Sequence, residues 1–261
     1  MSKSNFKERL HAGEHLIGAW ITLADPCVTE MLCGSGFDFL LIESEHTPQS
    51  IETVQRHIMA TKGSSTAPMV RVSANDPVLI KPVLDAGAIG VLVPQVSSAE
   101  DARRAVAACL YPPAGIRGFG ARRPTDYGRD IAGYIERANR EMVVWAQIEH
   151  IDAVNNLDVI LAVPGLDAVC TGQFDLAASM GLLGQVGHPR VIEAIERIIA
   201  RARHAHVPVG HMLGTDPHTA YDWLRRGAQF VSVGQDFTFL IEGANRTISE
   251  LGRLLRETPT S

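Results

Sequence analysis

Eight short apolar runs recur along the chain, and longer segments with apolar residues at helical spacing separate them. Each run is almost continuously apolar instead of alternating with polar residues. This pattern is typical of strands buried on both faces of a parallel sheet that helices cover. We predict strands over residues 16–22, 37–43, 67–72, 90–94, 142–149, 166–171, 207–212 and 230–234.

Recognisable helix starts lie between these runs. Asp76 precedes a proline, as an N-cap residue does when proline occupies the first turn. Ser98, three residues before Asp101, forms a pattern like a capping box. His188 and a following proline open another helix, and a last helix begins near Asp236.

The alternation of strands and helices favours one architecture. Eight βα repeats in one chain predict a closed (β/α)₈ barrel, a TIM barrel, formed by residues 1–261 as a single domain. A doubly wound open sheet is the alternative. Residues 112–129 are the one long irregular stretch, and a loop of this length in a compact domain is often functional.

Composition narrows the possible partners. With 46% hydrophobic residues, 20% charged residues and a net charge of −5, the chain has no general attraction for nucleic acid or an anionic membrane. No apolar run approaches the ~20 residues that span a bilayer, and the polar first residues do not form a signal peptide. The four cysteines show no CxxC spacing. We therefore expect a cytoplasmic protein with reduced thiols.

Polar residues leave the apolar strands where a barrel carries its active site, at the carboxyl ends of the strands. The candidates at these ends are Trp20, Glu43, His46, Arg71, Gln147, Glu149, Asp175, His211 and Leu213. His150, which follows Glu149, is a weaker candidate.

Glu149 and Asp175 follow neighbouring strands and are the candidate metal ligands. Two carboxylates without a required cysteine or histidine suit a hard divalent ion such as Mg²⁺ or Mn²⁺. A 2-oxo acid could fill two further coordination positions, and the ion would stabilise an enolate formed at the neighbouring carbon. The alternative is an acidic pair neutralised by arginine or by helix N-termini.

Arg71 and His46 add further chemistry. A guanidinium can hold a keto or carboxylate oxygen, although an ion pair with Glu43 or Glu149 is an equal alternative. A histidine on this rim can move a proton, with Glu43 or Asp85 orienting its ring, although a lone loop histidine is usually only solvated. None of the four lysines stands at a strand end, which argues against an imine-forming aldolase.

Several motifs along the chain form an ordered set: Leu41-Ile42-Glu43-Ser44-Glu45-His46, Val70-Arg71, Tyr111-Pro112-Pro113-Ala114-Gly115-Ile116-Arg117-Gly118, Gln147-Ile148-Glu149, Gly172-x-x-Asp175-Leu176 and Val233-Gly234-x-Asp236. In this order and spacing they resemble the motifs of the HpcH/HpaI aldolase family. The resemblance covers nearly the whole chain and lies closest to the branch that acts on 4-hydroxy-2-oxoheptanedioate.

The resemblance implies a class II aldolase that adds pyruvate, or a close 2-oxo acid such as hydroxypyruvate, reversibly to an aldehyde through a metal-stabilised enolate. It implies Mg²⁺ or Mn²⁺, with Co²⁺ or Zn²⁺ as alternatives. It also implies a homohexamer, built as a trimer of dimers, in which subunits exchange the last helix.

By position, the resemblance assigns metal binding to Glu149 and Asp175 and the pyruvate keto oxygen to Arg71. His46 would serve in acid–base chemistry, with Glu43 in the place of a usual aspartate.

Further positions complete the implied site. Gln147 would lie near metal and substrate, and the backbone of Phe174 and Asp175 would receive the pyruvate carboxylate. Asp85 matches an acidic residue that reaches a neighbouring subunit's site. Trp20 and Leu213, from the strand ends, are further candidates for substrate contact.

Two departures from the family pattern bear on the substrate. Glu43 is one methylene longer than the usual aspartate, and Gln173-Phe174 replaces a proline and a small residue. The arginines of the long loop, Arg117, Arg122 and Arg123, are candidates for binding an acidic tail on the aldehyde, with solvent exposure or subunit packing as the alternative.

Two rival functions remain. One is a related enolate-forming lyase on the same barrel, either for CoA thioesters or decarboxylating. The other is a non-catalytic barrel that binds a small acid. Activity on free pyruvate would distinguish the aldolase from the related lyase. The combination of metal ligands with a proton shuttle argues against a barrel that only binds a small acid.

Overall fold

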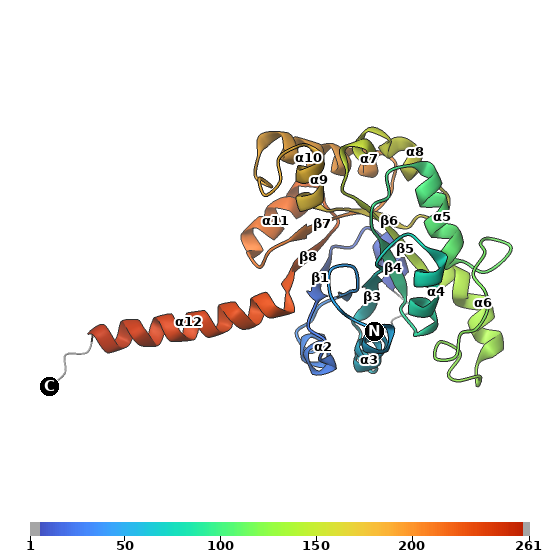
Figure 1. The fold of residues 1–261 in the computed structure, drawn as a ribbon, viewed down its shortest axis with the longest axis horizontal. Coiled ribbons are helices and arrows are strands. Elements are labelled where there is room, and N and C mark those ends of the chain that lie inside the picture. Colours follow the sequence, from blue (N-terminus) through green and yellow to red (C-terminus); the bar gives the residue numbers. More distant parts are fainter. Residues whose placement is uncertain (1–5, 258–261) are drawn as a thin grey trace.

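The computed structural model describes residues 6–257 and forms a closed barrel of eight parallel strands in sequence order. Helices surround the barrel (Figure 1). The eight predicted runs coincide with the observed strands to within two residues at each end, which confirms the (β/α)₈ prediction. The strands are β1 (Leu16–Ile21), β2 (Phe39–Glu43), β3 (Ala67–Arg71), β4 (Gly90–Val93), β5 (Val143–Ile148), β6 (Ala168–Thr171), β7 (Val209–Leu213) and β8 (Phe230–Gln235).

The predicted helix starts are also confirmed. The Asp76 carboxylate accepts the backbone N–H of Val78, and the Ser98 hydroxyl accepts that of Asp101. Such caps satisfy N–H groups that have no partner within the helix. The helices are α1 (Phe6–His11), α2 (Pro26–Cys33), α3 (Ile51–Ala60), α4 (Pro77–Asp85), α5 (Ala99–Cys109), α6 (Ile131–Glu141), α7 (Ile151–Asn155), α8 (Leu157–Leu161), α9 (Gln173–Ser179), α10 (Pro189–His204), α11 (Pro217–Arg226) and α12 (Asp236–Glu257).

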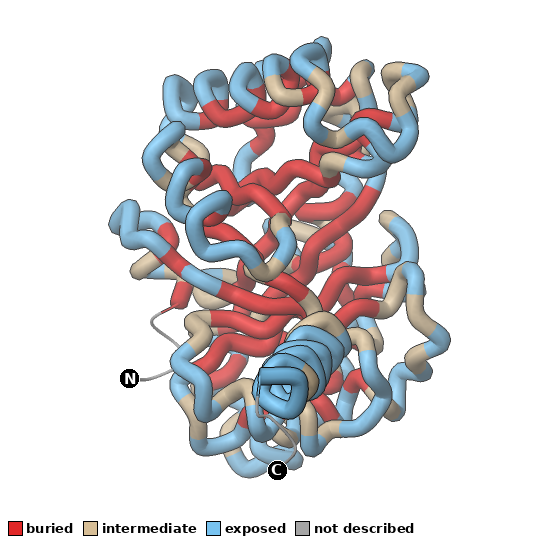
Figure 2. Tube along the Cα trace, turned by 90° about the vertical axis from the view of Figure 1, so that its left-hand side faces the viewer, coloured by how far each residue is buried: buried red, intermediate tan, exposed pale blue. Residues whose placement is uncertain are grey.

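Two apolar layers hold the barrel together, and both appear as the buried centre of Figure 2. Inside the barrel, the ring of Trp145 stacks on that of Phe230, with centroids 4.3 Å apart, and meets Phe39 edge-on. Phe6 of α1 packs on the same group and closes the amino end of the barrel. Because aromatic rings fill the interior, the barrel is a packed core and only its carboxyl end is open to a ligand.

Helix α12 differs from the others because it extends away from the barrel (Figure 1). Among its described residues only Asp236 is buried. That carboxylate accepts hydrogen bonds from the backbone N–H groups of Thr22 and Leu23 and from the Thr22 hydroxyl, so the start of the helix is fixed to the end of β1. The remaining turns expose leucine and isoleucine side chains.

Candidate active site

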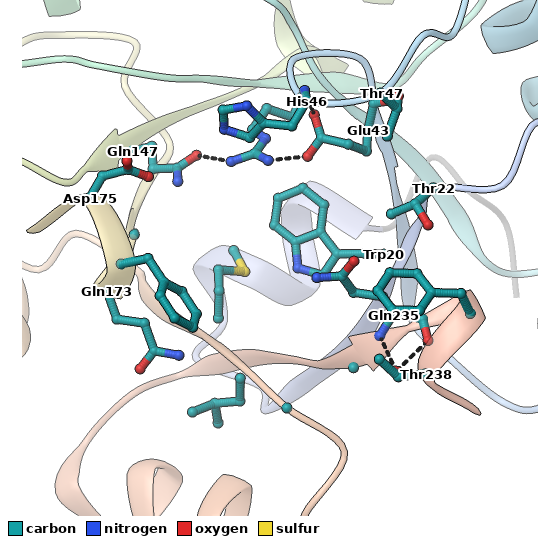
Figure 3. Close-up of a pocket in the computed structure, with 18 of the residues that line it drawn as sticks. Trp20, Thr22, Glu43, His46, Thr47, Gln147, Gln173, Asp175, Gln235 and Thr238 are labelled. Atoms are coloured by element: carbon teal, nitrogen blue, oxygen red, sulfur yellow. Dashed lines mark hydrogen bonds and ion pairs between the residues drawn. The ribbon is translucent and has the colours of Figure 1, made fainter. Parts of the chain in front are cut away.

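A cavity of about 680 Å³ opens at the carboxyl ends of the strands (Figure 3). Strands β1, β2, β3, β5, β7 and β8 and helix α9 contribute to its wall. Most of the site residues predicted from the sequence meet here. Those that line the cavity are Trp20, Glu43, His46, Arg71, Gln147, Phe174, Asp175 and Leu213.

Arg71, the last residue of β3, is buried at the centre of this wall. Its guanidinium donates a hydrogen bond to Glu43 and a longer one, 3.4 Å, to Gln147 Oε1. The indole ring of Trp20 lies beneath it, 4.5 Å from the guanidinium carbon to the ring centroid. Register explains this grouping, since Arg71 pairs with Glu43 across β2 and β3. Of the two alternative ion-pair partners, Glu43 and Glu149, the one that Arg71 contacts is Glu43.

Glu43 is itself a buried carboxylate with a second set of contacts. Its Oε1 atom accepts the backbone N–H groups of Glu45, at 2.6 Å, and His46, at 3.2 Å. The carboxylate thus joins Arg71 to the loop that carries His46. The expectation that Glu43 orients the imidazole directly is not met, because its two oxygens are used by Arg71 and by the backbone.

The His46 side chain is 64% exposed, and its Nε2 atom lies 3.8 Å from the Glu45 carboxylate. Glu45 also lies 3.3 Å from Arg71 Nε. It stands within the motif that marked the site, yet the sequence suggested no role for it. The signal that could have identified Glu45 is its place two residues after Glu43, the last residue of β2, because polar residues that follow a barrel strand lie at the active-site rim.

Three carboxylates face a smaller adjoining cavity of about 430 Å³. They belong to Glu45, Glu149 and Asp175. Burial raises the pKa of Glu149 to about 7, and the nearby negative charges of Glu45 and Asp175 act in the same direction; the N–H of Gln95 and the charge of Arg71 oppose the rise. Burial likewise raises the pKa of Glu45.

This donor set fits a hard divalent ion. One oxygen of the Glu45 carboxylate is buried and accepts no hydrogen bond, and a divalent charge beside the three carboxylates would offset their mutual repulsion. Within residues 6–257, no three acidic, histidine or cysteine side chains converge tightly enough to enclose an ion alone. Two protein ligands, Glu149 and Asp175, would instead leave coordination positions for water and substrate.

Gly172 is a further residue on which the site depends. A Cβ atom at this position would lie 2.6 Å from an oxygen of Glu149, 2.8 Å from the Glu149 Cβ and 2.6 Å from the amide nitrogen of Gln147. Glycine here lets the chain pass from β6 into α9 directly against the carboxylate. Helix α9 begins at Gln173, directly after this glycine.

Of two further candidate histidines, only His150 reaches the site, where it lines the smaller cavity. His211 is fully buried, packs against Trp223 with ring centroids 4.5 Å apart and bonds to Thr171, so the expectation that it reaches the rim is wrong. Its position in β7 explains this, because alternate residues of a strand face outward. The ring of His150 accepts the N–H of Asp152 and caps α7.

Asp85 lies away from the cavity of its own chain. It ends α4, near the start of β4 and thus at the opposite end of the barrel, and its carboxylate pairs with Arg117 at 2.7 Å. Arg123 donates to the carbonyls of Ala86 and Ile58. None of the three candidate arginines of the long loop, Arg117, Arg122 and Arg123, lines the main cavity of this chain. A role for Asp85 in a neighbouring subunit stays a prediction.

The fold and the cavity together define a class of protein: a barrel enzyme whose carboxyl rim combines a buried arginine, a group of carboxylates and a histidine. Comparison with protein families agrees, because residues 16–243 match the HpcH/HpaI aldolase/citrate lyase family. The chain belongs to this family. It is accordingly an aldolase, a carbon–carbon lyase.

Individual relatives support this assignment over nearly the full length. The chain is 44% identical to the 4-hydroxy-2-oxo-heptane-1,7-dioate aldolase of Salmonella paratyphi C (strain RKS4594), over 96% of this chain and 95% of the relative. A crystal structure of an HpcH/HpaI aldolase/citrate lyase family protein from Burkholderia cenocepacia J2315 superposes with a TM-score of 0.91 at 32% identity, covering 95% of this chain and 99% of that one.

Two further solved structures share the fold. The HpcH/HpaI aldolase of Desulfitobacterium hafniense DCB-2 gives a TM-score of 0.88 at 30% identity, with 97% of each chain covered. The citrate synthase SbnG gives 0.86 at 27% identity, with 96% of this chain and 98% of that chain covered. In the described part of this chain, no helix has the length and apolarity to cross a membrane.

Proposed function

We propose that the protein catalyses the reversible aldol addition of pyruvate, or a close 2-oxo acid such as hydroxypyruvate, to an aldehyde, with Mg²⁺ or Mn²⁺ as cofactor. The observation that carries the proposal is the position of one buried guanidinium, that of Arg71, beside the carboxylates of Glu45, Glu149 and Asp175. At one rim, the Arg71 guanidinium and a metal ion bound by the carboxylates can together hold a small 2-oxo acid and stabilise its enolate.

Glu149 and Asp175 would hold the ion. When bound, the ion supplies a positive charge that stabilises the negative oxygen of the enolate. Glu149 suits this role because it is buried, and its Oε1 atom is fixed by the N–H of Gln95 at 2.7 Å. The carboxylate is therefore oriented before metal binds.

Arg71 would bind the keto oxygen of pyruvate. Its contacts with Glu43 and Gln147 fix the guanidinium plane, and the Trp20 ring supports it from below. A preorganised cation near the position where charge develops lowers the barrier without reorganisation during the reaction. The backbone of Phe174 and Asp175 would receive the pyruvate carboxylate at the start of α9.

His46 would exchange a proton with the hydroxyl oxygen of the aldol product. The imidazole is exposed toward the cavity opening and has Glu45 as its carboxylate neighbour. Glu43 would act as a positioning residue, because it holds the backbone of the His46 loop and the Arg71 side chain at the same time.

We also propose a homohexamer in which α12 packs on a neighbouring subunit. An isolated helix that exposes Leu240, Ile241, Ile248, Leu251 and Leu255 has no partner for this apolar surface within residues 6–257. Burying such residues against another copy would stabilise the assembly by about 1.5–3 kcal/mol for each side chain. In this assembly Asp85 would approach a neighbouring subunit's site.

The test is formation of a new carbon–carbon bond from pyruvate. Protein freed of metal with EDTA is incubated with pyruvate, a panel of aldehydes and either Mg²⁺ or Mn²⁺, and products are identified by NMR and mass spectrometry. We expect metal-dependent aldol products that Glu149→Gln abolishes. Glu193→Gln, which changes an exposed carboxylate on α10, is the matched control and should retain activity. Absence of product with every metal and aldehyde would contradict the proposal.

A further inference from the structure

The two ends of the main cavity differ in charge. Glu43, Arg71 and Gln147 stand at one end, with His46 nearby (Figure 3). At the other end, Gln235 and Thr238 lie on one side and Gln173 on the other. All the charged residues in the lining belong to the first group or to Asp175. The end beyond Trp20 is uncharged, and in our proposal this end receives the substituent of the aldehyde.

Two side-chain amides at this end have no partner in the described part of the chain. Gln235 donates its backbone N–H to the Thr238 hydroxyl at 3.0 Å and accepts a hydrogen bond from it at 2.6 Å, which fixes the backbone and leaves the side-chain amide free. Strand register places Gln235 beside Trp20. Across the cavity the Gln173 amide is also free, and both residues are only partly exposed.

The hydroxyl groups nearby are already engaged. Thr22 donates to the carboxylate of Asp236 at 2.5 Å, and Thr238 donates to the backbone carbonyl of Gln235 at 2.6 Å. The amides of Gln173 and Gln235 are therefore the polar groups at this end that remain available to a ligand. A carboxamide both donates and accepts, so it suits a hydroxyl group better than a carboxylate, which only accepts.

Among the described residues that line the cavity, no cation is free to receive a second carboxylate. Arg71 is held by Glu43, and Arg117 is held by Asp85 on the far side of the barrel. Bringing an anionic tail into a partly enclosed cavity without a cationic partner carries a desolvation cost that nothing here offsets. The diacid in the name of the Salmonella relative would cleave to pyruvate and succinic semialdehyde, an aldehyde with such a tail.

We infer that the aldehyde substrate is short and uncharged and carries hydroxyl groups that bond to Gln235 and Gln173; this inference rests on the proposed function. In the synthetic direction the pyruvate methyl group loses one proton, and its carbon forms a bond to the aldehyde carbon. The aldehyde oxygen takes up one proton and becomes the new hydroxyl. The hydroxyl groups of the aldehyde remain unchanged and serve only in recognition.

The experiment compares kcat/KM for glyceraldehyde, propanal and succinic semialdehyde, each with pyruvate at saturation. We expect kcat/KM of the wild-type protein to be on the order of tenfold or more higher for glyceraldehyde than for succinic semialdehyde, because succinic semialdehyde would bring one unpaired charge into the cavity. Gln235→Met should lower the ratio of kcat/KM for glyceraldehyde to kcat/KM for propanal by about three- to tenfold, because one neutral hydrogen bond to the substrate is lost. General damage to the enzyme would lower both rates and leave the ratio unchanged.

Two further variants sharpen the test. Gln55→Met makes the same change on the exposed face of α3 and should leave the ratio at its wild-type value. Gln235→Arg should raise kcat/KM for succinic semialdehyde relative to glyceraldehyde by about tenfold or more, since hydrogen bonds to charged groups are the stronger ones.

A wild-type preference for succinic semialdehyde, or an unchanged ratio in Gln235→Met, would overturn the inference. Exchange of the pyruvate methyl protons with solvent separates this failure from that of the proposed function. If exchange occurs while the aldehyde preference is reversed, only the inference about the acceptor is wrong. If exchange is absent with every metal, the proposed function is wrong and the inference falls with it.

Discussion

Acid should destabilise the protein through one buried histidine. His211 is fully buried, and its Nδ1 atom bonds to the hydroxyl of Thr171. Its Nε2 atom has no hydrogen-bond partner. Burial lowers the pKa of His211 from 6.5 to about 3, because the charged ring would lose its hydration.

The sign of the effect follows from proton uptake. The unfolded chain binds a proton at His211 below pH 6.5, whereas the folded chain binds one only near pH 3. Stability from the neutral ring is therefore fully present above pH 6.5 and declines as the pH falls from 6.5 toward 3. At pH 5 the loss from this residue amounts to about 2 kcal/mol.

Equilibrium urea unfolding at pH 8 and pH 5, with EDTA in both buffers to remove metal linkage, measures this loss. His211→Asn keeps a polar group near Thr171 but cannot titrate. The variant should lose about 2 kcal/mol less than the wild type between the two pH values. His57, whose pKa burial also lowers, remains in both proteins and cancels in the comparison. Parallel losses in the two proteins would refute the reasoning.

Other substitutions test the site and the assembly. Gly172→Ala should reduce metal affinity, measured by calorimetry with Mn²⁺, because its Cβ would collide with Glu149; unchanged affinity would show that the loop relaxes freely. Glu43→Gln removes the nearer of the two carboxylates beside the buried guanidinium of Arg71, leaves only Glu45 there, and should destabilise the protein by about 1–3 kcal/mol in thermal or urea unfolding. Equal stability to the wild type would show that other groups compensate. A triple variant with Leu240→Glu, Ile248→Glu and Leu255→Glu places charges on the apolar face of α12. It should dissociate the oligomer, as measured by light scattering, and an intact hexamer would refute the proposed helix exchange.

Much of the fold could be predicted because its signals are local. Continuous apolar runs marked the strands, and a cap such as Asp76 before a proline marked a helix start. Strand order then followed, since eight βα units close in sequence order. For the same reason, residues at strand ends such as Arg71 and Gln147 could be placed together at one rim.

Contacts that depend on side-chain direction could not be predicted in this way. Glu43 was expected beside the His46 ring, but its carboxylate reaches the backbone of that loop and Arg71 instead. His211 lies one residue from an inward-facing position and so faces Trp223. Asp85 ends a helix that returns to the far end of the barrel, which spacing along the chain alone does not reveal.

The exposed surface of α12 shows a different limit of prediction from sequence. The sequence predicted a helix from about Asp236, and nothing in residues 6–257 covers its Leu240 or Ile248 side chains. An amphipathic pattern reports that a face is apolar and does not report which chain covers it.

The central claim is that the arginine and carboxylates at the barrel rim convert pyruvate to its enolate. Exchange of pyruvate methyl protons in D₂O, followed by NMR without any aldehyde, tests this most directly. We predict exchange with Mn²⁺ or Mg²⁺ that stops with EDTA, is lost in Glu149→Gln and persists in Glu193→Gln. Absence of exchange with either metal, or exchange that survives both EDTA and Glu149→Gln, would contradict the account.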